Sequence, residues 1–264
     1  MFSSLASAAL LRGPGSEILD MAAASRPDAR GLETLPALAP FLVRPGRALA
    51  RRPPAPTGLD PLDGLLGGGF PRGQISEIVG PRTSGRTSLV LDCLAWSTAR
   101  GALAALVDVT DGLDPASARA RGMRLDQLLW VRCGGRVVVG VKAADVIIRG
   151  GGFDVVAVDL GDLPPWALAR VPAAAFVRLQ RTVEGTPTAL LMAGPQRVAG
   201  SLAAVAVALT RGRVDWTPGG PRLLSGLTVE ARLIRSRERA PGAAVRIVWR
   251  IDEPPSLGGA PRDA

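Results

Sequence analysis

Short apolar runs recur along the middle of the chain, separated by segments with helical spacing. The runs cover 75–79, 103–109, 128–133, 154–159 and 188–192. Each has the length of a strand and is apolar throughout, which is typical of strands buried on both faces of a parallel sheet. Helices are expected between them, over 86–99, 115–121, 142–149 and 166–184. This alternation predicts an α/β three-layer sandwich with a mainly parallel sheet and a ligand site at the carboxyl ends of its strands.

The pattern changes to alternation with period two near the C-terminus. Apolar residues occupy every second position over 227–233 and again over 245–251, and Pro241-Gly242 lies between the two segments. Such alternation is typical of strands with one buried face, and a Pro-Gly pair favours a turn. We therefore expect a C-terminal antiparallel hairpin that extends the sheet.

The two ends of the chain differ from the middle in composition. Residues 1–56 contain one candidate helix, over 16–24 with Ser16 as its N-cap, followed by a linker rich in proline and arginine. The prediction is an N-terminal helix and linker over 1–56, a core over 57–251 and a disordered tail over 252–264. No run reaches the length of a membrane span, and the first residues lack the basic segment of a signal peptide.

A glycine-rich turn follows the first apolar run. Gly80 ends the run, and the turn leads directly into the helical spacing of 86–99. In this setting the pattern G-x-x-x-x-G-K-[ST] indicates a phosphate-binding loop, because backbone N–H groups and the helix N-terminus both face the anion. The candidate nucleotide-binding residues are Gly80, Pro81, Arg82, Thr83, Ser84, Gly85, Arg86, Thr87 and Ser88.

The turn departs from this pattern at one position, where Arg86 replaces the lysine. Lys142 is the only lysine of the chain, so the exchange is also explained by an arginine-favouring composition. The exchange of lysine for arginine changes the fit to a phosphate, because a planar guanidinium needs more room in the binding loop than a compact ammonium. We therefore expect weakened or lost nucleotide chemistry.

Composition narrows the class of protein. The 264 residues include 32 basic and 23 acidic ones, a net charge of +9, and 47% are hydrophobic. A globular core is expected, and the charge fits an anionic partner as well as it fits a soluble protein from an arginine-rich proteome. The absence of histidine and tyrosine excludes histidine-based catalysis and tyrosine stacking. Cys93 and Cys133 lie in a predicted helix and strand without metal-ligand spacing, so a reduced, cytoplasmic protein is expected.

Residues 57–79 resemble the start of the core of RecA and its relatives. Thr57-Gly58, Leu62-Asp63 and the segment 66–73 lead straight into the first strand. The resemblance continues over 106–115 and over 153–159, which is similar to a Walker B strand ending at Asp159. It extends to about residue 250 and implies a RecA-like P-loop fold.

Within that resemblance, three positions that serve hydrolysis in RecA-type ATPases carry other residues. Thr110 replaces the glutamate that activates water, Ser117 replaces the aromatic residue that stacks on adenine, and Gly194-Pro195 replaces the Asn-Gln pair that senses the terminal phosphate. Asp159 and Thr87 remain as metal-binding candidates if Mg-nucleotide binds. The expectation is a protein that is not an enzyme, requires no cofactor, and binds ATP and Mg²⁺ weakly at most, without turnover.

The two loops that line the DNA axis in RecA correspond to short segments here, and basic charge is concentrated elsewhere. Residues 211–250 carry nine arginines against three acidic residues. Arg232, Arg246 and Arg250 alternate with apolar positions and are expected to share one exposed face of the hairpin. This face is predicted to bind DNA or an acidic protein surface; the alternative is a solvated edge that resists aggregation.

A RecA-like core with these departures and no long C-terminal domain is similar to the ImuA branch, which includes SulA-like forms. That resemblance implies a non-catalytic accessory protein of damage-induced translesion synthesis and mutagenesis in the SOS response. The implied partners are an ImuB-like polymerase relative, an error-prone replicative-type DNA polymerase and RecA, with DNA as a further partner and no membrane. Two alternatives stay open: a SulA-like inhibitor of cell division, and an active RecA-type DNA-dependent ATPase.

Overall fold

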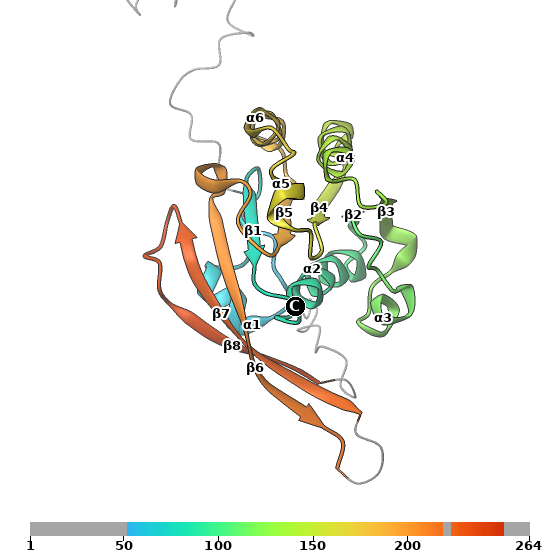
Figure 1. The fold of residues 1–264 in the computed structure, drawn as a ribbon, viewed down its shortest axis with the longest axis vertical. Helices are drawn as coiled ribbons and strands as arrows, with labels where there is room; N and C mark the ends of the chain where they lie inside the picture. Colours follow the sequence, from blue (N-terminus) through green and yellow to red (C-terminus); the bar gives the residue numbers. More distant parts are fainter. Residues whose placement is uncertain (1–51, 219–222, 251–264) are drawn as a thin grey trace, which may run out of the picture. The chain divides into compact units, whose positions relative to one another are not determined.

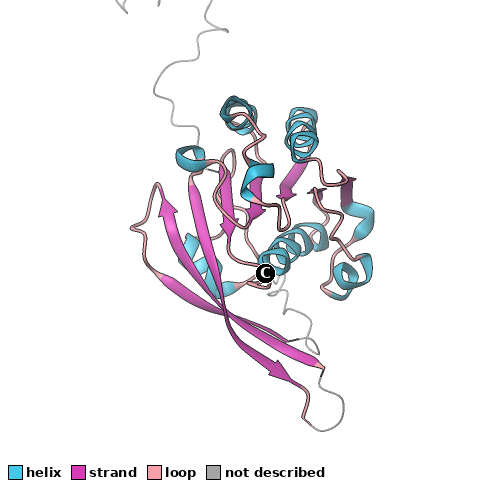
Figure 2. Cartoon of the chain, viewed as in Figure 1, coloured by secondary structure: helices cyan, strands magenta, loops and turns pink. Residues whose placement is uncertain are grey.

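The computed structural model describes residues 52–218 and 223–250, which form an eight-stranded sheet between two layers of helices (Figure 1, Figure 2). The strand order is β3-β2-β4-β5-β1-β6-β7-β8; neighbours from β3 to β6 are parallel, and β7 and β8 are added antiparallel. The strands are β1 (Ile75–Val79), β2 (Leu103–Asp108), β3 (Leu128–Arg132), β4 (Phe153–Asp159), β5 (Ala189–Gly194), β6 (Val205–Trp216), β7 (Leu224–Ser236) and β8 (Ala244–Arg250).

Helices cover both faces of the sheet, and each face has its own apolar core. Leu89 and Leu94 of α2 belong to one core, and Ile147 of α4 and Leu179 of α6 belong to the other. Figure 1 shows α4 and α6 together on the face opposite α2. The helices are α1 (Asp60–Leu66), α2 (Arg86–Ala99), α3 (Pro115–Ala120), α4 (Val137–Gly150), α5 (Pro165–Leu168) and α6 (Ala173–Val183), with 3₁₀ turns η4 (Leu125–Gln127) and η5 (Gly200–Leu202).

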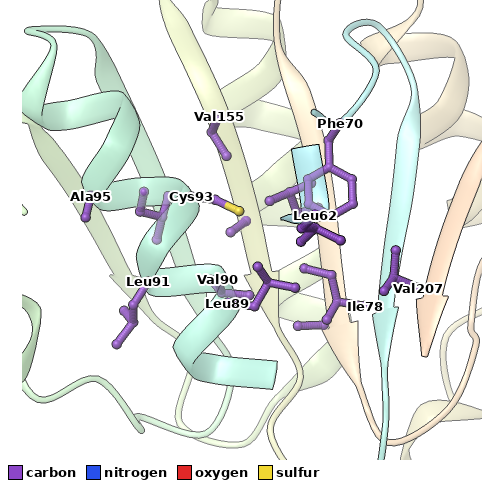
Figure 3. Close-up of a cluster of buried hydrophobic side chains, with 14 of the residues drawn as sticks. Leu62, Phe70, Ile78, Leu89, Val90, Leu91, Cys93, Ala95, Val155 and Val207 are labelled. Atoms are coloured by element: carbon purple, nitrogen blue, oxygen red, sulfur yellow. The ribbon is translucent and has the colours of Figure 1, made fainter. Parts of the chain in front are cut away.

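The core on the α2 face surrounds the first strand. Ile78 points from β1 toward Leu89 of α2, while Phe70 and Leu62 come from the segment that precedes β1 (Figure 3). All four side chains are almost completely buried. Since burying a large apolar side chain stabilises a fold by about 1.5–3 kcal/mol, this packing fixes β1 and the start of α2, which hold the glycine-rich turn between them.

The α/β fold with a mainly parallel sheet and a C-terminal antiparallel hairpin is confirmed. One strand, β6, was not predicted from the sequence; it pairs with β1 on one side and with β7 on the other. Its first half, 205–209, is apolar at every position, as in the runs that did predict strands, and it is buried because it lies in the middle of the sheet. The segment that follows, from Thr210 to Arg213, has no apolar residue and did not indicate that the strand continues.

Two helices differ from their predicted bounds. The segment 166–184 forms two helices, α5 and α6, because Pro172 interrupts it and becomes the N-cap of α6. The helix predicted over 142–149 begins earlier, at Val137, since Val137, Val141 and Ala144 continue its buried stripe toward the N-terminus.

The predicted helix over 16–24, most of the linker over 1–56, and the predicted tail over 252–264 lie outside the described residues. Among the residues that are described, no helix combines the length and apolar character needed to cross a bilayer. Cys93 and Cys133 are both buried free thiols, and burial raises the pKa of each.

Candidate functional site

The glycine-rich turn lies between β1 and the N-terminus of α2, as predicted from the sequence. Gly85 adopts a φ of 90°, which glycine tolerates without steric cost, and Thr83 adopts 62°. Ser84 is fully buried inside the turn, and its Oγ finds no hydrogen-bond partner among the described residues. A buried polar atom without a partner is costly, so this hydroxyl is available to a group that enters the turn.

Thr87 and Asp159 are brought together by the fold. The Thr87 hydroxyl donates to Oδ2 of Asp159 at 3.2 Å, and the Gly161 N–H donates to the other carboxylate oxygen at 2.9 Å. Burial raises the pKa of Asp159, and these two hydrogen bonds partly counteract it. A hydroxyl next to a carboxylate at a helix N-terminus is an arrangement that can hold Mg²⁺ with a bound phosphate.

Arg86 does not face the turn as a free cation. Its Nη1 donates to the Gly161 carbonyl at 3.1 Å, and its Nη2 forms an ion pair with Asp162. The Arg86 side chain is 8% exposed. Arg86 therefore ties the start of α2 to the loop that follows β4 through two separate nitrogens, whereas a lysine carries its charge on a single nitrogen.

Three further arginines and one serine lie around the turn. Arg82 is exposed and lies 3.6 Å from Asp162, while Pro81 beside it is also exposed. Arg211, from β6, donates to Oγ1 of Thr83 at 3.3 Å. Ser88 accepts from Arg121 of the α3 region at 3.1 Å. Arginines therefore surround the turn, but Arg82 lies beside Asp162 and Arg121 is paired with Asp92.

The three replaced hydrolysis positions lie at the same end of the sheet but perform other roles. Thr110 is exposed and packs against Gly161. The Ser117 hydroxyl donates to Asp114 at 2.6 Å at the N-terminus of α3. Gly194 ends β5, and its carbonyl accepts from the Gly80 N–H at 3.3 Å. None of these three residues carries a carboxylate or an aromatic ring.

Trp249 is a residue near the turn that sequence reasoning did not connect to it. Its indole lies against Gly85, where an added Cβ would be 2.6 Å from Cζ3, and its Nε1 donates to Asp92 of α2 at 2.6 Å. The alternation over 245–251 identified Trp249 as an inward-facing position. No feature of the sequence indicated that β8 crosses the start of α2.

Arg232, Arg246 and Arg250 are exposed on one face of the β7–β8 hairpin, as expected. Glu230 lies directly opposite Arg246, and it also forms an ion pair with Arg232. Arg232 in addition donates to the Gly242 carbonyl at 3.0 Å. The face is therefore basic with one acidic residue inside it.

The strand–turn–helix geometry, the Thr87–Asp159 pair and the parallel sheet define an α/β protein of the P-loop class. Residues 53–167 match the RecA N-terminal domain family. Protein RecA of Levilactobacillus brevis is 33% identical over 207 residues, which is 72% of this chain and 52% of that protein. Protein RecA of Treponema pallidum is 30% identical over 213 residues, 73% of this chain and 50% of that protein.

A third relative matches a shorter part of the chain at a higher sequence identity. Protein RecA of Methylococcus capsulatus is 46% identical over 105 residues, covering 39% of this chain and 30% of that protein. Together with the fold, these similarities place the chain in the RecA-like superfamily. The chain spans about half the length of the two relatives with the long alignments.

Proposed function

We propose that the chain is a non-catalytic RecA-like accessory protein of damage-induced translesion synthesis, similar to the ImuA branch. In this proposal it works by contact with DNA or with the polymerase components of that pathway. The phosphate turn keeps a structural role and binds ATP with Mg²⁺ weakly at most. Ser84, Thr87 and Asp159 are the residues that would hold such a nucleotide.

The state of Arg86 is the observation that carries the proposal. Its guanidinium is buried and bonded to Gly161 and Asp162. A phosphate-binding lysine supplies its charge directly to the phosphates, so an arginine engaged elsewhere leaves that role unfilled. Breaking the Arg86–Asp162 pair to free the guanidinium would also remove a contact between α2 and the loop after β4.

Thr110 supports the proposal independently. Its hydroxyl has no acidity or basicity suited to activating water. Loss of a positioned general base lowers a rate by about 10²–10⁴-fold. The defect differs in kind from that at Arg86, so repair of one does not repair the other.

A second candidate, an active RecA-type ATPase, is favoured by the retained Thr87–Asp159 pair at 3.2 Å and by the names of the similar proteins. In that case Arg86 would have to leave Asp162 when nucleotide enters. The two candidates differ in whether phosphate is released from ATP.

The deciding experiment is a phosphate-release assay with purified full-length protein, ATP, Mg²⁺ and single-stranded DNA. We expect no release above background for the natural chain or for Arg86→Lys. The double variant Arg86→Lys/Thr110→Glu is expected to gain at most a trace. Hydrolysis by the natural chain that Asp159→Ala abolishes would contradict the proposal and favour the ATPase.

A further inference from the structure

An apolar hollow of about 510 Å³ lies between α5, α6 and the segment 196–202. Its lining contains the buried side chains of Leu168, Val171 and Phe176 and the exposed side chain of Val177. None of the turn residues 80–87 lines it, and no acidic residue is among its lining residues. A concave, mainly apolar site of this size is typical of a ligand or peptide pocket.

One wall of the hollow is held in place by a buried acid. Glu77, 1% exposed in β1, accepts from the N–H groups of Val198 at 2.6 Å and Ala199 at 2.8 Å. It also accepts from Nε of Arg197 at 2.9 Å. A charge-assisted network of this kind fixes the backbone of 197–199 against the sheet. The wall is therefore preformed rather than created by a ligand.

The opposite wall is anchored through Arg86. Arg86 bonds to Gly161 and Asp162, and the chain then continues through Pro164 into α5. Pro165 and Leu168 of α5 line the hollow. Two buried charged residues, Glu77 and Arg86, thus hold the two sides, and preorganisation of a site reduces the entropy lost on binding.

An exposed tryptophan is adjacent in sequence to a lining residue, and one of the apolar lining residues is itself exposed. Trp166 follows the lining residue Pro165 and is 68% exposed, and Val177 of α6 is 37% exposed. Exposed tryptophan beside a preformed pocket is the type of residue that contributes most to protein–protein binding.

Positive charge beside the hollow favours a partner segment that carries acidic residues. Exposed Arg170 lies between the lining residues Ala169 and Val171, and exposed Arg181 lies one helical turn beyond Val177. Arg197 also lines the hollow, but its charge is balanced by Glu77. We infer that the hollow docks a short segment of a partner protein that carries large apolar side chains next to carboxylates. This inference does not depend on the proposed accessory function, and the site is separate from the basic face of β7 and β8.

A peptide selection tests the inference. Full-length protein is used to select binders from a displayed library of random peptides, and a fluorescent copy of the enriched peptide is titrated by anisotropy. We expect enriched sequences that combine acidic and large apolar residues. Trp166→Ala and Val177→Asp are expected to weaken binding of the enriched peptide by about tenfold or more, because tryptophan is a frequent hot-spot residue and a carboxylate at 177 repels an acidic peptide. Binding should also weaken as salt is raised.

Val146→Ala is the matched control, since Val146 of α4 is 67% exposed and does not line the hollow. It should leave the affinity unchanged. Failure to enrich any such peptide, or equal affinity for the natural chain, Trp166→Ala and Val177→Asp, would overturn the inference. If Val177→Asp abolished self-association in sedimentation, the hollow would be a contact between copies of this chain, and the inference would be overturned. It would also be overturned if Trp166→Ala abolished binding of a single-stranded oligonucleotide while peptide binding persisted.

Discussion

At the level of single residues, the carboxylate of Asp92 joins three parts of the fold. It accepts from Trp249 of β8 at 2.6 Å and from Arg121, which follows α3, at 2.6 Å, while Asp92 itself belongs to α2. Burial raises the pKa of Asp92 above its ordinary 3.8, and these two donors partly counteract that rise. The ionised carboxylate is thus stabilised only as long as both donors are present.

Trp249→Phe removes one donor and keeps most of the ring. We expect a loss of about 1–3 kcal/mol in the free energy of unfolding at pH 7, as for a buried hydrogen bond to a charged group. The Trp249 bond favours the ionised form, so its contribution is present above the raised pKa of Asp92 and is lost as the pH falls through it. Urea denaturation at pH 7 and at pH 4 measures the difference.

Trp216→Phe is the control for this prediction, because Trp216 is 48% exposed. It should change the free energy of unfolding by no more than about 0.5 kcal/mol at either pH. An equal loss for Trp249→Phe at both pH values would show that packing, and not the hydrogen bond to Asp92, is responsible.

Single positions could be predicted from the sequence more readily than their partners. Arg86 was identified as the departure in the turn, and Thr87 and Asp159 as a candidate pair. The engagement of Arg86 with Asp162 could not be predicted, because it depends on how the loop after β4 folds back toward α2. The same holds for Trp249 and Asp92, which are distant in sequence and meet only through the position of β8.

At the level of elements, β8 determines how much space the start of α2 has. Trp249 lies so close to Gly85 that an added Cβ would be 2.6 Å from the ring. Such a contact with a buried ring cannot be relieved by moving a flexible chain end. The turn and the hairpin are therefore packed as one unit.

Gly85→Ala is expected to destabilise the protein by clearly more than Gly101→Ala. Both glycines have positive φ, 90° and 80°, so both substitutions carry a strain of about 1–2 kcal/mol. Only Gly85 has a ring in the way, whereas nothing lies within 4 Å of an added Cβ at Gly101. Overpacking adds about 1–3 kcal/mol at Gly85. Thermal unfolding of both variants makes the comparison, and equal losses would contradict this packing.

Most strands and the helices between them could be predicted, because buried parallel strands and amphipathic helices leave different periodicities. β6 was overlooked, although its run 205–209 is apolar throughout like the strands that were predicted. Its exposed part, from Thr210 to Arg213, has no apolar position that would indicate a strand. The single helix expected over 166–184 took no account of Pro172. Proline has no backbone N–H, so it cannot continue the hydrogen bonds of a helix.

At the level of the whole molecule, the excess of basic charge on the hairpin should govern binding of polyanions. Reversal of Arg232, Arg246 and Arg250 to glutamate is expected to weaken binding of single-stranded DNA. It should also reduce the slope of log K against log salt by about 0.7 for each phosphate group that the variant no longer neutralises. Arg232 also bonds to Glu230 and the Gly242 carbonyl, so unfolding is measured in parallel.

The matched control reverses three exposed arginines away from the hairpin, Arg119, Arg136 and Arg178, which gives the same change in net charge. Fluorescence anisotropy at several salt concentrations compares the two triple variants. If both lower the affinity equally, total charge rather than the hairpin face attracts DNA. If neither does, the hairpin is a solvated edge.

The position of β6 between β1 and β7 has a kinetic consequence. β6, β7 and β8 follow one another along the chain and can pair as a local meander, whereas the pairing of Ser76 in β1 with Val205 in β6 closes a very long loop. Long-range parallel pairing is slow because the loop entropy is lost before the strands gain their pairing energy. Until β1 arrives, one side of β6 presents unpaired backbone groups next to the apolar run 205–209, and this exposed edge is where aggregation during refolding is expected to begin.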